Sequence, residues 1–547
     1  MKSLSRYRPE IGSEILSVLA AAYIAFFLND TFWEKATVYL AANGSALVAL
    51  RVAILSLLIV CTTLASAKFL IKPALIFLIG VSAAASWFTD SFGVVVDTDM
   101  VRNIFETTST EAKDLFTTGF LRHLALYFLL PSLLIVWVRV RHRTLLRKVF
   151  WNSIVSISCL LVFAGIGMAY YKPYSAVVRT KRDLVKTFNP VTPLVSTVKY
   201  ALGAGREMTI VARPLGTDAT VKAAADGSRK PKVAVVVVGE TTRGANFSLG
   251  SYTRETNPML ARQDVIYFPN VASCGTATDV SLPCMFSNLK RSGYSHDTGL
   301  ANENVLDVLR RAGIDVTWLD NNTGSKGIAD RVRYLNIGGS SDARFCKDGE
   351  CKDGIFLDKV DGWLANIKKD SVLVLHQLGN HGPSYYERYP DDFRRFVPDC
   401  QTSELANCKD QEIVNAYDNA ILYTDAVLSQ VIDRLKANSD RVSAGFLYIS
   451  DHGESLGERG LYLHGTPYML APDEQTRIPL IVWFDPGFAA SMSLDVSCLR
   501  NSASSSRSHD NLFSSLLGMM NVSTKVYEQE MDLFAGCRRP VGIHSSP

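Results

Sequence analysis

The sequence has little net charge and lacks several motifs that would assign it to a common class. Its 57 Lys and Arg residues against 53 Asp and Glu residues leave a formal charge of +4, which argues against a general nucleic-acid binder. Hydrophobic residues make up 48% of the chain, so a disordered, low-complexity protein is excluded. No Walker-type phosphate loop is present, so nucleotide-dependent group transfer is not indicated.

Charged residues are scarce in the first third of the chain. Residues 1–171 contain 25 of the 110 Asp, Glu, Lys and Arg residues, and residues 172–547 contain the other 85. The full length of 547 residues also exceeds the roughly 100–200 residues of one domain. The composition therefore indicates a membrane-like first part and an ordinary globular second part.

Five long apolar runs account for this first part. A membrane-spanning helix needs about 20 largely apolar residues. A cleaved signal peptide would explain the first run but not the four that follow. We predict an α-helical membrane domain over residues 1–171, with five transmembrane helices at about residues 11–29, 46–67, 69–89, 118–138 and 149–171.

The charged loops set the orientation of these helices. Lys and Arg residues precede the first span and occupy alternate loops, with Arg139, Arg141, Arg143, Arg147 and Lys148 between the last two spans. The loop between the third and fourth spans carries mostly acids. By the positive-inside rule, five spans that start in the cytoplasm place everything after Tyr171 outside it.

Cysteine pairs with the short CxxC spacing of a structural zinc site are absent. Cys61 and Cys159 lie inside apolar runs, where a thiol behaves as a small hydrophobic group. The other eight cysteines lie in the C-terminal part and include three close pairs, Cys274/Cys284, Cys346/Cys351 and Cys400/Cys408. Close, even-numbered cysteines favour disulfides in an oxidising compartment, which agrees with the orientation. Whether Cys498 and Cys537 pair is left open.

The pattern of the remaining chain predicts a linker followed by an α/β domain. Residues 172–231 have weak periodicity and several prolines, which predicts a bridging linker with an amphipathic helix along the membrane surface. From residue 232 to 547, helical patterns alternate with short apolar runs at Val233–Val238, Asp315–Leu319, Val372–Leu375, Ala444–Ile449 and Ile478–Trp483. This alternation predicts a mostly parallel sheet covered by helices on both faces.

Polar residues follow these predicted strands where the strands end. Glu240 follows the first strand, and the adjacent pair Asp451 and His452 follows a later one. Carboxyl ends of parallel strands meet at one edge of a sheet, where α/β proteins form their sites. Two carboxylates with one imidazole suit Zn²⁺ or Mn²⁺ better than a thiolate site does. The sequence therefore predicts a metal site at this edge.

The segment between Ser273 and Cys284 is rich in hydroxyl groups and closed by a cysteine at each end. A metal ion can activate a Ser or Thr hydroxyl as a nucleophile. Spacing alone does not choose among Thr276, Thr278 and Ser281. His381 and His464 could bind a phosphate oxygen or protonate a leaving alkoxide, since histidine titrates near neutral pH. Lys326 could pair with a phosphate.

Four motifs together resemble the lipid A phosphoethanolamine transferases, a family that includes the mobile colistin-resistance enzymes. They are Val-Val-Gly-Glu-Thr-Thr-Arg at 237–243, Ser-Cys-Gly-Thr-Ala-Thr at 273–278, Gly-Asn-His-Gly-Pro-Ser-Tyr-Tyr at 379–386 and Ser-Asp-His-Gly-Glu-Ser-Leu-Gly-Glu at 450–458. The resemblance covers nearly the whole chain. It implies five spans, a bridging segment and an alkaline phosphatase/sulfatase-like periplasmic domain.

The resemblance also implies residue roles. Thr278 matches the nucleophile, and the zinc ligands are implied to be Glu240, Asp451, His452 and the Thr278 oxygen. His381, His464 and Lys326 match residues near the transferred phosphate, and Ser325 beside Lys326 is expected to bind substrate. The outer-loop residues Asn103, Thr107 and Glu111 match residues thought to reach the ethanolamine, and their spacing predicts one helical face. The family's disulfides match 274–284, 346–351 and 400–408.

The activity implied is transfer of phosphoethanolamine from phosphatidylethanolamine to a lipid A phosphate, through a covalent phosphoethanolamine-threonine intermediate, with release of diacylglycerol. One tightly bound Zn²⁺ would suffice, and a second ion near His381 and His464 is not required. The added amine lowers the negative surface charge and the attraction for cationic peptides such as polymyxin. We expect a multi-pass monomer of the bacterial inner membrane with its catalytic domain in the periplasm and no nucleic-acid partner.

Rival interpretations remain. The acceptor could be a core-sugar phosphate, a Kdo sugar or another periplasmic glycan. A lipid-dependent glycerol-phosphate transferase shares the architecture but uses another donor. A sulfatase is disfavoured because no Cys/Ser-x-Pro-x-Arg motif lies near residues 273–284. A sensor or scaffold with a decayed enzyme domain would lack metal ligands, and here all matched positions are filled.

Overall fold

A computed structural model of the chain describes residues 8–107, 109–181, 183–207, 210–221, 230–347 and 349–539, with only the backbone described for 109–111 and 204–207. The chain divides into two compact units, each interrupted in sequence. The first comprises Met1–Val101 and Phe116–Leu202, and the second comprises Arg102–Leu115 and Gly203–Pro547. The predicted linker, 172–231, therefore contributes residues to both units.

The first unit is helical, as the apolar runs predict. Its long helices are α1 (Ser13–Phe27), α2 (Asp30–Tyr39), α3 (Gly44–Leu64), α4 (Ile71–Phe92), α7 to α8 through a π-helical turn (Thr118–Trp137) and α9 (Leu145–Ala169). Four of these described helices are long and apolar enough to span a membrane, and the pair α1 and α2, bent by 65°, makes a fifth if it forms one span. Three shorter helices follow, α10 (Tyr171–Thr180), α11 (Asp183–Lys186) and α12 (Val191–Glu207).

The second unit is built on an eight-stranded sheet in the order β15-β5-β14-β11-β4-β10-β6-β7. The five predicted strands are confirmed as β4 (Lys232–Gly239), β6 (Asp315–Asp320), β10 (Ser371–His376), β11 (Ser443–Ser450) and β14 (Arg477–Phe484). The sequence did not predict β5 (Ile266–Ala272), β7 (Arg333–Asn336) or β15 (Arg507–Ser508). β7 and β15 span only four and two residues, too few to show an alternation, and β5 contains Pro269, which interrupts a strand pattern.

The sheet is mostly parallel, and one strand runs against the rest. β14 pairs antiparallel with both β11 and β5, while the pairs β11–β4, β4–β10 and β10–β6 are all parallel. The parallel register brings the strand ends to one level, since Ser450 lies opposite Gly239 and His376 opposite both Val238 and Asp320. Residues that follow β4, β6, β10 and β11 therefore emerge side by side.

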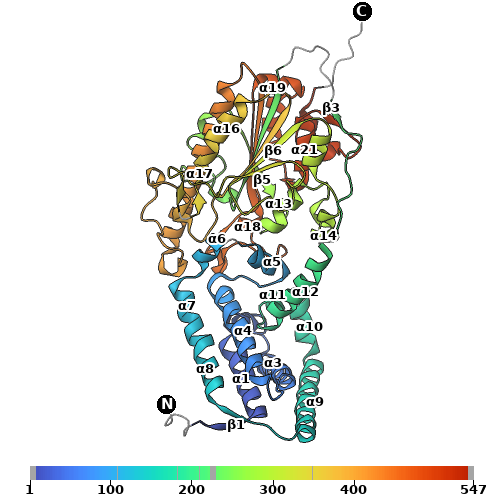
Figure 1. Cartoon of the computed structure of the whole chain (residues 1–547), viewed down its shortest axis with the longest axis vertical. Helices are drawn as coiled ribbons and strands as arrows, with labels where there is room; N and C mark the ends of the chain where they lie inside the picture. The colour runs from blue at the N-terminus through green and yellow to red at the C-terminus, as the bar shows by residue number, and fades with distance from the viewer. Residues whose placement is uncertain are drawn as a thin grey trace, which may run out of the picture. The chain divides into compact units, whose positions relative to one another are not determined.

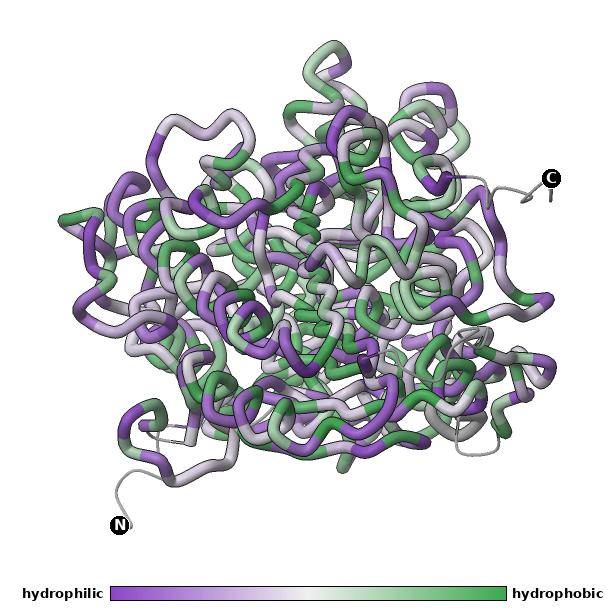
Figure 2. Tube along the Cα trace, turned by 90° about the horizontal axis from the view of Figure 1, so that it is seen from above, coloured by the Kyte–Doolittle hydropathy of each residue, from purple (hydrophilic) through white to green (hydrophobic). Residues whose placement is uncertain are grey.

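Helices cover both faces of this sheet. Helices α16 (Phe356–Ala365) and α17 (Asp410–Ala437) lie on one face, and α13 (Thr278–Phe286) and α21 (Leu512–Met519) lie on the other, with α15 (Val305–Arg311) packed beside α21 and β6 (Figure 1). The valines of β4 are completely buried. Hydrophobic residues gather in the interior and hydrophilic ones along the outer loops (Figure 2). The buried sheet thus fixes the positions of the polar residues that follow its strands, and a site is expected at that edge.

All four cysteine pairs of the second unit form disulfides. They join Cys274 to Cys284, Cys346 to Cys351, Cys400 to Cys408 and Cys498 to Cys537. Cys61 and Cys159 are the free cysteines, and both lie in spanning helices. The bond between Cys498 and Cys537 answers the question that the sequence left open.

Candidate metal and nucleophile site

Glu240, Asp451 and His452 meet at the carboxyl edge of the sheet, and all three side chains are fully buried. One ligand atom from each lies within 4.8 Å of the others. Asp451 and His452 follow β11, and Glu240 follows the neighbouring strand β4. The predicted convergence of these residues is therefore present in the folded chain.

The three side chains of this group face one another with acceptor atoms, so they do not hydrogen-bond to one another. His452 donates from Nδ1 to the carbonyl of Gly453 at 2.9 Å, which leaves the lone pair of Nε2 directed at the group. That lone pair lies 3.3 Å from Asp451 Oδ2 and 3.4 Å from Glu240 Oε1. Asp451 Oδ2 is buried and accepts no hydrogen bond from the described residues. Three converging acceptors in a buried place need a cation, and this donor set fits zinc.

The charges of the group follow from its burial. Burial, and then the charge of Glu240, raise the pKa of Asp451 well above its usual range. Burial also raises the pKa of Glu240, but His452 and His381 outweigh it and hold this pKa at about 2. Burial and the neighbouring His464 lower the pKa of His452 to about 3. The imidazole is therefore neutral at physiological pH, the form that binds metals.

Thr278 points its hydroxyl into this group. Its Oγ1 lies 3.1 and 3.2 Å from the two carboxylate oxygens of Glu240 and 3.3 Å from His452 Nε2. Thr278 is the first residue of α13, whose preceding residue Ala277 is extended. The start of a helix favours negative charge, which helps an oxygen that becomes an alkoxide or binds a phosphoryl group. Of the three hydroxyl residues that the sequence left open, the geometry favours Thr278.

The other two hydroxyl residues point elsewhere. Thr276 Oγ1 donates to the carbonyl of Thr466 at 2.7 Å, and Ser281 Oγ donates to the carbonyl of Asp451. Both side chains are buried. Their hydroxyl protons are already engaged with backbone oxygens, so they hold the loop in place.

Two further groups hold the carboxylates of Glu240 and Asp451, and the sequence did not single them out as site residues. Asn322 Nδ2 donates to Glu240 Oε2 at 2.8 Å and to the carbonyl of Gln377, also at 2.8 Å. Thr241 has a left-handed backbone (φ 55°), and its N–H donates to Asp451 Oδ1 at 3.0 Å. A non-glycine residue at positive φ is a strained feature that clusters at functional sites. Local sequence carries no signal of that conformation.

His381 and His464 lie beside this group of candidate metal ligands, as expected. The ring centroid of His464 is 4.5 Å from that of His452 and 5.3 Å from that of His381. His464 Nδ1 is 3.3 Å from Glu454 Oε2, a carboxylate that orients the ring. His381 and Asn322 also line a cavity of about 220 Å³. Their roles as phosphate-handling residues stay a prediction.

Lys326 and Ser325 lie in the loop after β6. Lys326 Nζ is paired with Glu106 Oε2 at 2.9 Å, and no described contact joins it to Thr278. Ser325 Oγ accepts the N–H of Ala329 at 3.2 Å. Both residues keep their predicted substrate roles as untested expectations.

The predicted single helical face of Asn103, Thr107 and Glu111 is wrong. The chain forms two helices here, α5 (Thr98–Glu106) and α6 (Ser109–Leu115), and Thr107 lies between them. The N–H and Oγ1 of Thr107 both donate to the Asn103 carbonyl, at 2.8 and 2.6 Å. The first is an ordinary helical hydrogen bond, and the second shares the same carbonyl, a back-bond that slightly destabilises and often bends a helix. The side chain of Glu111 lies outside the described residues.

This fold and this edge of the sheet define a membrane protein with an α/β domain built around a metal-competent hydroxyl site. A family model described as Sulfatase matches residues 232–522, and one described as phosphoethanolamine transferase EptA/EptB matches residues 54–204. The chain is also 38% identical over 541 residues to phosphoethanolamine transferase EptA of Escherichia coli (strain K12), covering 97% of this chain and 98% of the relative. The chain belongs to the phosphoethanolamine transferase family.

Solved structures agree with this assignment. The integral membrane lipooligosaccharide phosphoethanolamine transferase A (EptA) from Neisseria meningitidis matches with a TM-score of 0.93 and 35% identity, over 97% of this chain and all of that chain. The C-terminal periplasmic domain of phosphoethanolamine transferase EptC from Campylobacter jejuni is 42% identical with a TM-score of 0.52, over 59% of this chain and 97% of that domain. The chain is accordingly an integral inner-membrane protein with its C-terminal domain in the periplasm.

Proposed function

We propose that this protein transfers phosphoethanolamine from phosphatidylethanolamine to a phosphate of lipid A, with Thr278 as the covalent carrier. The observation that carries the proposal is the Thr278 hydroxyl, held 3.1–3.3 Å from Glu240 and His452 in a chain of the phosphoethanolamine transferase family. The lipooligosaccharide named for the Neisseria relative supports a lipid A-type acceptor.

Zinc fits the group formed by Glu240, Asp451, His452 and the Thr278 oxygen, and when bound it would lower the pKa of the hydroxyl and neutralise developing negative charge. In the first half of the reaction, Thr278 Oγ1 attacks the phosphorus of the donor lipid. The bond from phosphorus to the glycerol oxygen breaks, and diacylglycerol leaves with a proton. The nearest acceptors for the Thr278 proton are the oxygens of Glu240.

Protons for the leaving oxygen are best supplied by His464 or His381, the imidazoles beside the site. In the second half, a phosphate oxygen of lipid A attacks the phosphorus of phospho-Thr278, and the threonine oxygen leaves and regains a proton. Two transfers at one nucleophile predict ping-pong kinetics. Both substrates are lipids, so a catalytic domain tethered to the membrane meets them at a raised effective concentration.

The covalent step is tested with purified full-length protein in detergent. We expect phosphatidylethanolamine to add one phosphoethanolamine to Thr278, detected by intact-protein and peptide mass spectrometry. Thr278→Ala should lose the adduct and all transfer, while Thr278→Ser keeps a hydroxyl and some activity. Transfer by Thr278→Ala would contradict the nucleophile. An adduct from phosphatidylglycerol instead would identify a glycerol-phosphate transferase.

The acceptor is tested in cells with and without the protein. We expect mass spectrometry to find phosphoethanolamine on lipid A only in cells that carry the wild-type chain, with Thr278→Ala as the matched control. Such cells should also tolerate more polymyxin, because the added amine reduces the negative surface charge. Unmodified lipid A beside a modified core sugar would replace the acceptor and leave the chemistry at Thr278 intact.

A further inference from the structure

His509 is a fully buried histidine outside the metal-binding group, and it contacts two of the segments that form the site. It follows β15, which pairs in parallel with the end of β5 so that Ser508 lies opposite Ala272. The segment that leaves β5 here, Ser273–Ala277, leads to Thr278, and we call it the nucleophile loop. The pairing of β15 therefore places the His509 ring directly beside this loop.

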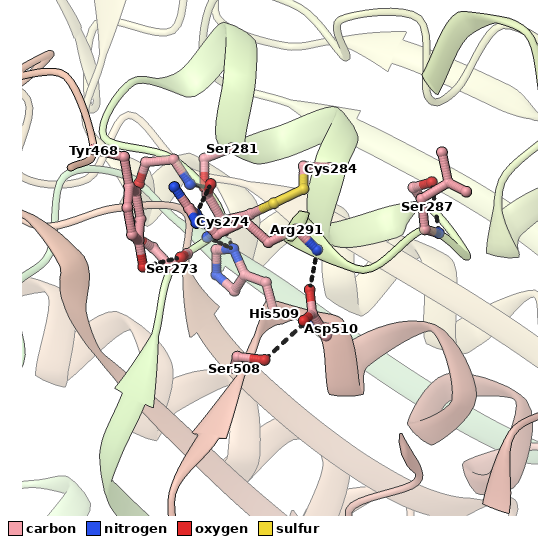
Figure 3. The surroundings of a disulfide bond; sticks show 12 residues. Ser273, Cys274, Ser281, Cys284, Ser287, Arg291, Tyr468, Ser508, His509 and Asp510 are labelled. Atoms are coloured by element: carbon pink, nitrogen blue, oxygen red, sulfur yellow. Dashed lines mark hydrogen bonds between the residues drawn. A yellow bond between two sulfur atoms is a disulfide. The ribbon is translucent and has the colours of Figure 1, made fainter. Parts of the chain in front are cut away.

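The two ring nitrogens of His509 join the loop to the strand that carries the metal ligands. The N–H of Cys274 donates to His509 Nδ1 at 2.9 Å, and His509 Nε2 donates to the carbonyl of Ser450 at 2.8 Å. A backbone N–H only donates and a carbonyl only accepts, so this geometry fixes the Nε2–H tautomer. Ser450 ends β11, and Asp451 and His452 follow it. Figure 3 shows the ring with one nitrogen aimed at Cys274.

A second connection runs parallel to this one. Ser281, in α13, donates its hydroxyl proton to the carbonyl of Asp451 and accepts the N–H of Gly275 at 3.2 Å. Its oxygen is 3.4 Å from His509 Nδ1. Helix α13, the nucleophile loop and the end of β11 therefore share one buried hydrogen-bond network with His509 at its centre.

The residue after His509 holds the loop from the other side (Figure 3). Asp510 Oδ1 accepts the N–H of Arg291 at 2.8 Å, and the Arg291 Nε–H donates to the Cys274 carbonyl at 3.1 Å. Cys274 is thus held at its N–H by His509 and at its carbonyl by Arg291. The disulfide to Cys284 ties the same residue to α13. The loop is fixed at several points, and His509 and Ser281 are the residues that join it to the end of β11.

We infer that His509 is a positioning residue of the reaction, which sets the distance between the Thr278 hydroxyl and the Asp451-His452 pair by joining the two segments that carry them. The inference rests on the proposed function of Thr278. Thr278 and His452 are 174 residues apart in the chain, yet their Oγ1 and Nε2 atoms lie 3.3 Å apart. A misplacement of about 1 Å at a reacting group can lower the rate about 100-fold. A residue that joins the two segments can therefore have a large effect on the rate without contacting the substrate.

The test uses three variants of the full-length protein in detergent. His509→Asn keeps an acceptor near the Nδ1 position, His509→Gln keeps a donor near the Nε2 position, and His509→Ala keeps neither. Ser515→Ala is the matched control, because buried Ser515 donates to the Asn511 carbonyl at 2.6 Å and accepts the Leu533 N–H at 2.8 Å without contacting the loop or β11. For each variant we would measure the zinc affinity by chelator competition and the melting temperature. We would also measure kcat and KM, with the enzyme concentration taken as the fraction of protein whose Thr278 accepts the label.

We expect His509→Ala to bind zinc at least about tenfold more weakly and to lose about 10- to 100-fold in kcat with little change in the donor KM, with Asn and Gln in between. Ser515→Ala should lower only the melting temperature. If the Asn and Gln variants lose melting temperature but keep wild-type zinc affinity and kcat, His509 is merely structural and the inference is overturned. If the wild-type protein forms no adduct, the proposed function fails, and zinc affinity still decides whether His509 positions the ligands.

Discussion

Lys326 Nζ lies 2.9 Å from Glu106 Oε2, an ion pair that joins α5 to the loop after β6. The lysine side chain is 11% exposed and the glutamate side chain 33% exposed. A second ion pair joins the following helix, α6, to the catalytic domain. Arg388 lies 3.6 Å from Asp114 of α6 and pairs with Glu350 at 2.7 Å. The segment Arg102–Leu115 is thus fastened to the catalytic domain at both of its short helices.

This pair predicts the effect of removing the Glu106 charge. If Lys326 binds a substrate phosphate, the phosphate must first replace the Glu106 carboxylate. Glu106→Gln should therefore lower the donor KM about two- to fivefold, in line with the roughly 1 kcal/mol of a partly exposed ion pair. Lys326→Ala should raise the same KM. A higher KM for Glu106→Gln, measured by transfer to a labelled acceptor lipid, would instead place Glu106 among the substrate-binding groups.

Removing the metal should stop transfer. The converging oxygens of Glu240 and Asp451 and the His452 lone pair repel one another without a cation, so we expect chelation to abolish adduct formation on Thr278 and added Zn²⁺ to restore it. Asp451→Asn should lower bound zinc, measured by elemental analysis, and reduce activity at least about 100-fold. Asp433→Asn, at an exposed position of α17, is the control and should retain both. Full activity of a zinc-free sample would exclude the metal from the mechanism.

Gly453 should tolerate no side chain. A Cβ atom there would lie 2.1 Å from the carbonyl oxygen of Glu474, and the Gly453 N–H donates to the Gln475 carbonyl at 3.0 Å. Gly453→Ala should therefore push the Asp451-His452 turn away from Glu240, with a loss of about 1–3 kcal/mol in stability and weaker zinc binding. Gly536→Ala, where nothing lies within 4 Å of the added atom, provides the comparison. Equal melting temperatures and zinc affinities for the two variants would show that the turn can shift.

Asp425 should make stability depend on pH. Burial raises its pKa to about 7, even though its oxygens accept the N–H groups of Met259 and Leu260 at 2.8 and 3.0 Å. An unfolded aspartate has a pKa of about 3.9, so the folded state holds this proton more tightly. The resulting stability is complete below about pH 4 and is lost as the pH rises through about 7.

Asp425→Asn removes this titration. Relative to the variant, the wild-type protein should lose on the order of a few kcal/mol between pH 5 and pH 8, measured as the difference in melting temperature at each pH. Asp433→Asn again serves as the control, because its carboxylate is exposed. A constant difference between Asp425→Asn and wild type across this range would mean that Asp425 is ionised throughout.

Local patterns were sufficient for the main elements of the fold. The valine-rich run at 233–238 favoured a fully buried strand. The strand ends carry Glu240 and the Asp451-His452 pair to one edge because parallel strands end together. The helix over Asn103, Thr107 and Glu111 was predicted wrongly, because a spacing of four residues does not show where a helix ends, and here α5 ends at Glu106 and α6 begins at Ser109. Spacing alone likewise left Thr276, Thr278 and Ser281 equivalent, and only the family resemblance pointed to Thr278.

The sequence by itself determined the division into a membrane part and a globular part, the membrane-spanning runs and the residue types of a zinc-competent site. Hydropathy and the residues that follow each apolar run can be read from local sequence. Only the tertiary structure decided which hydroxyl faces that site, because Thr276 and Ser281 are turned to carbonyls of Thr466 and Asp451 that are distant in sequence. It alone also placed His509 between Cys274 and Ser450. The individual contacts that a side chain makes with distant segments depend on how the whole domain is assembled, and local patterns do not encode them.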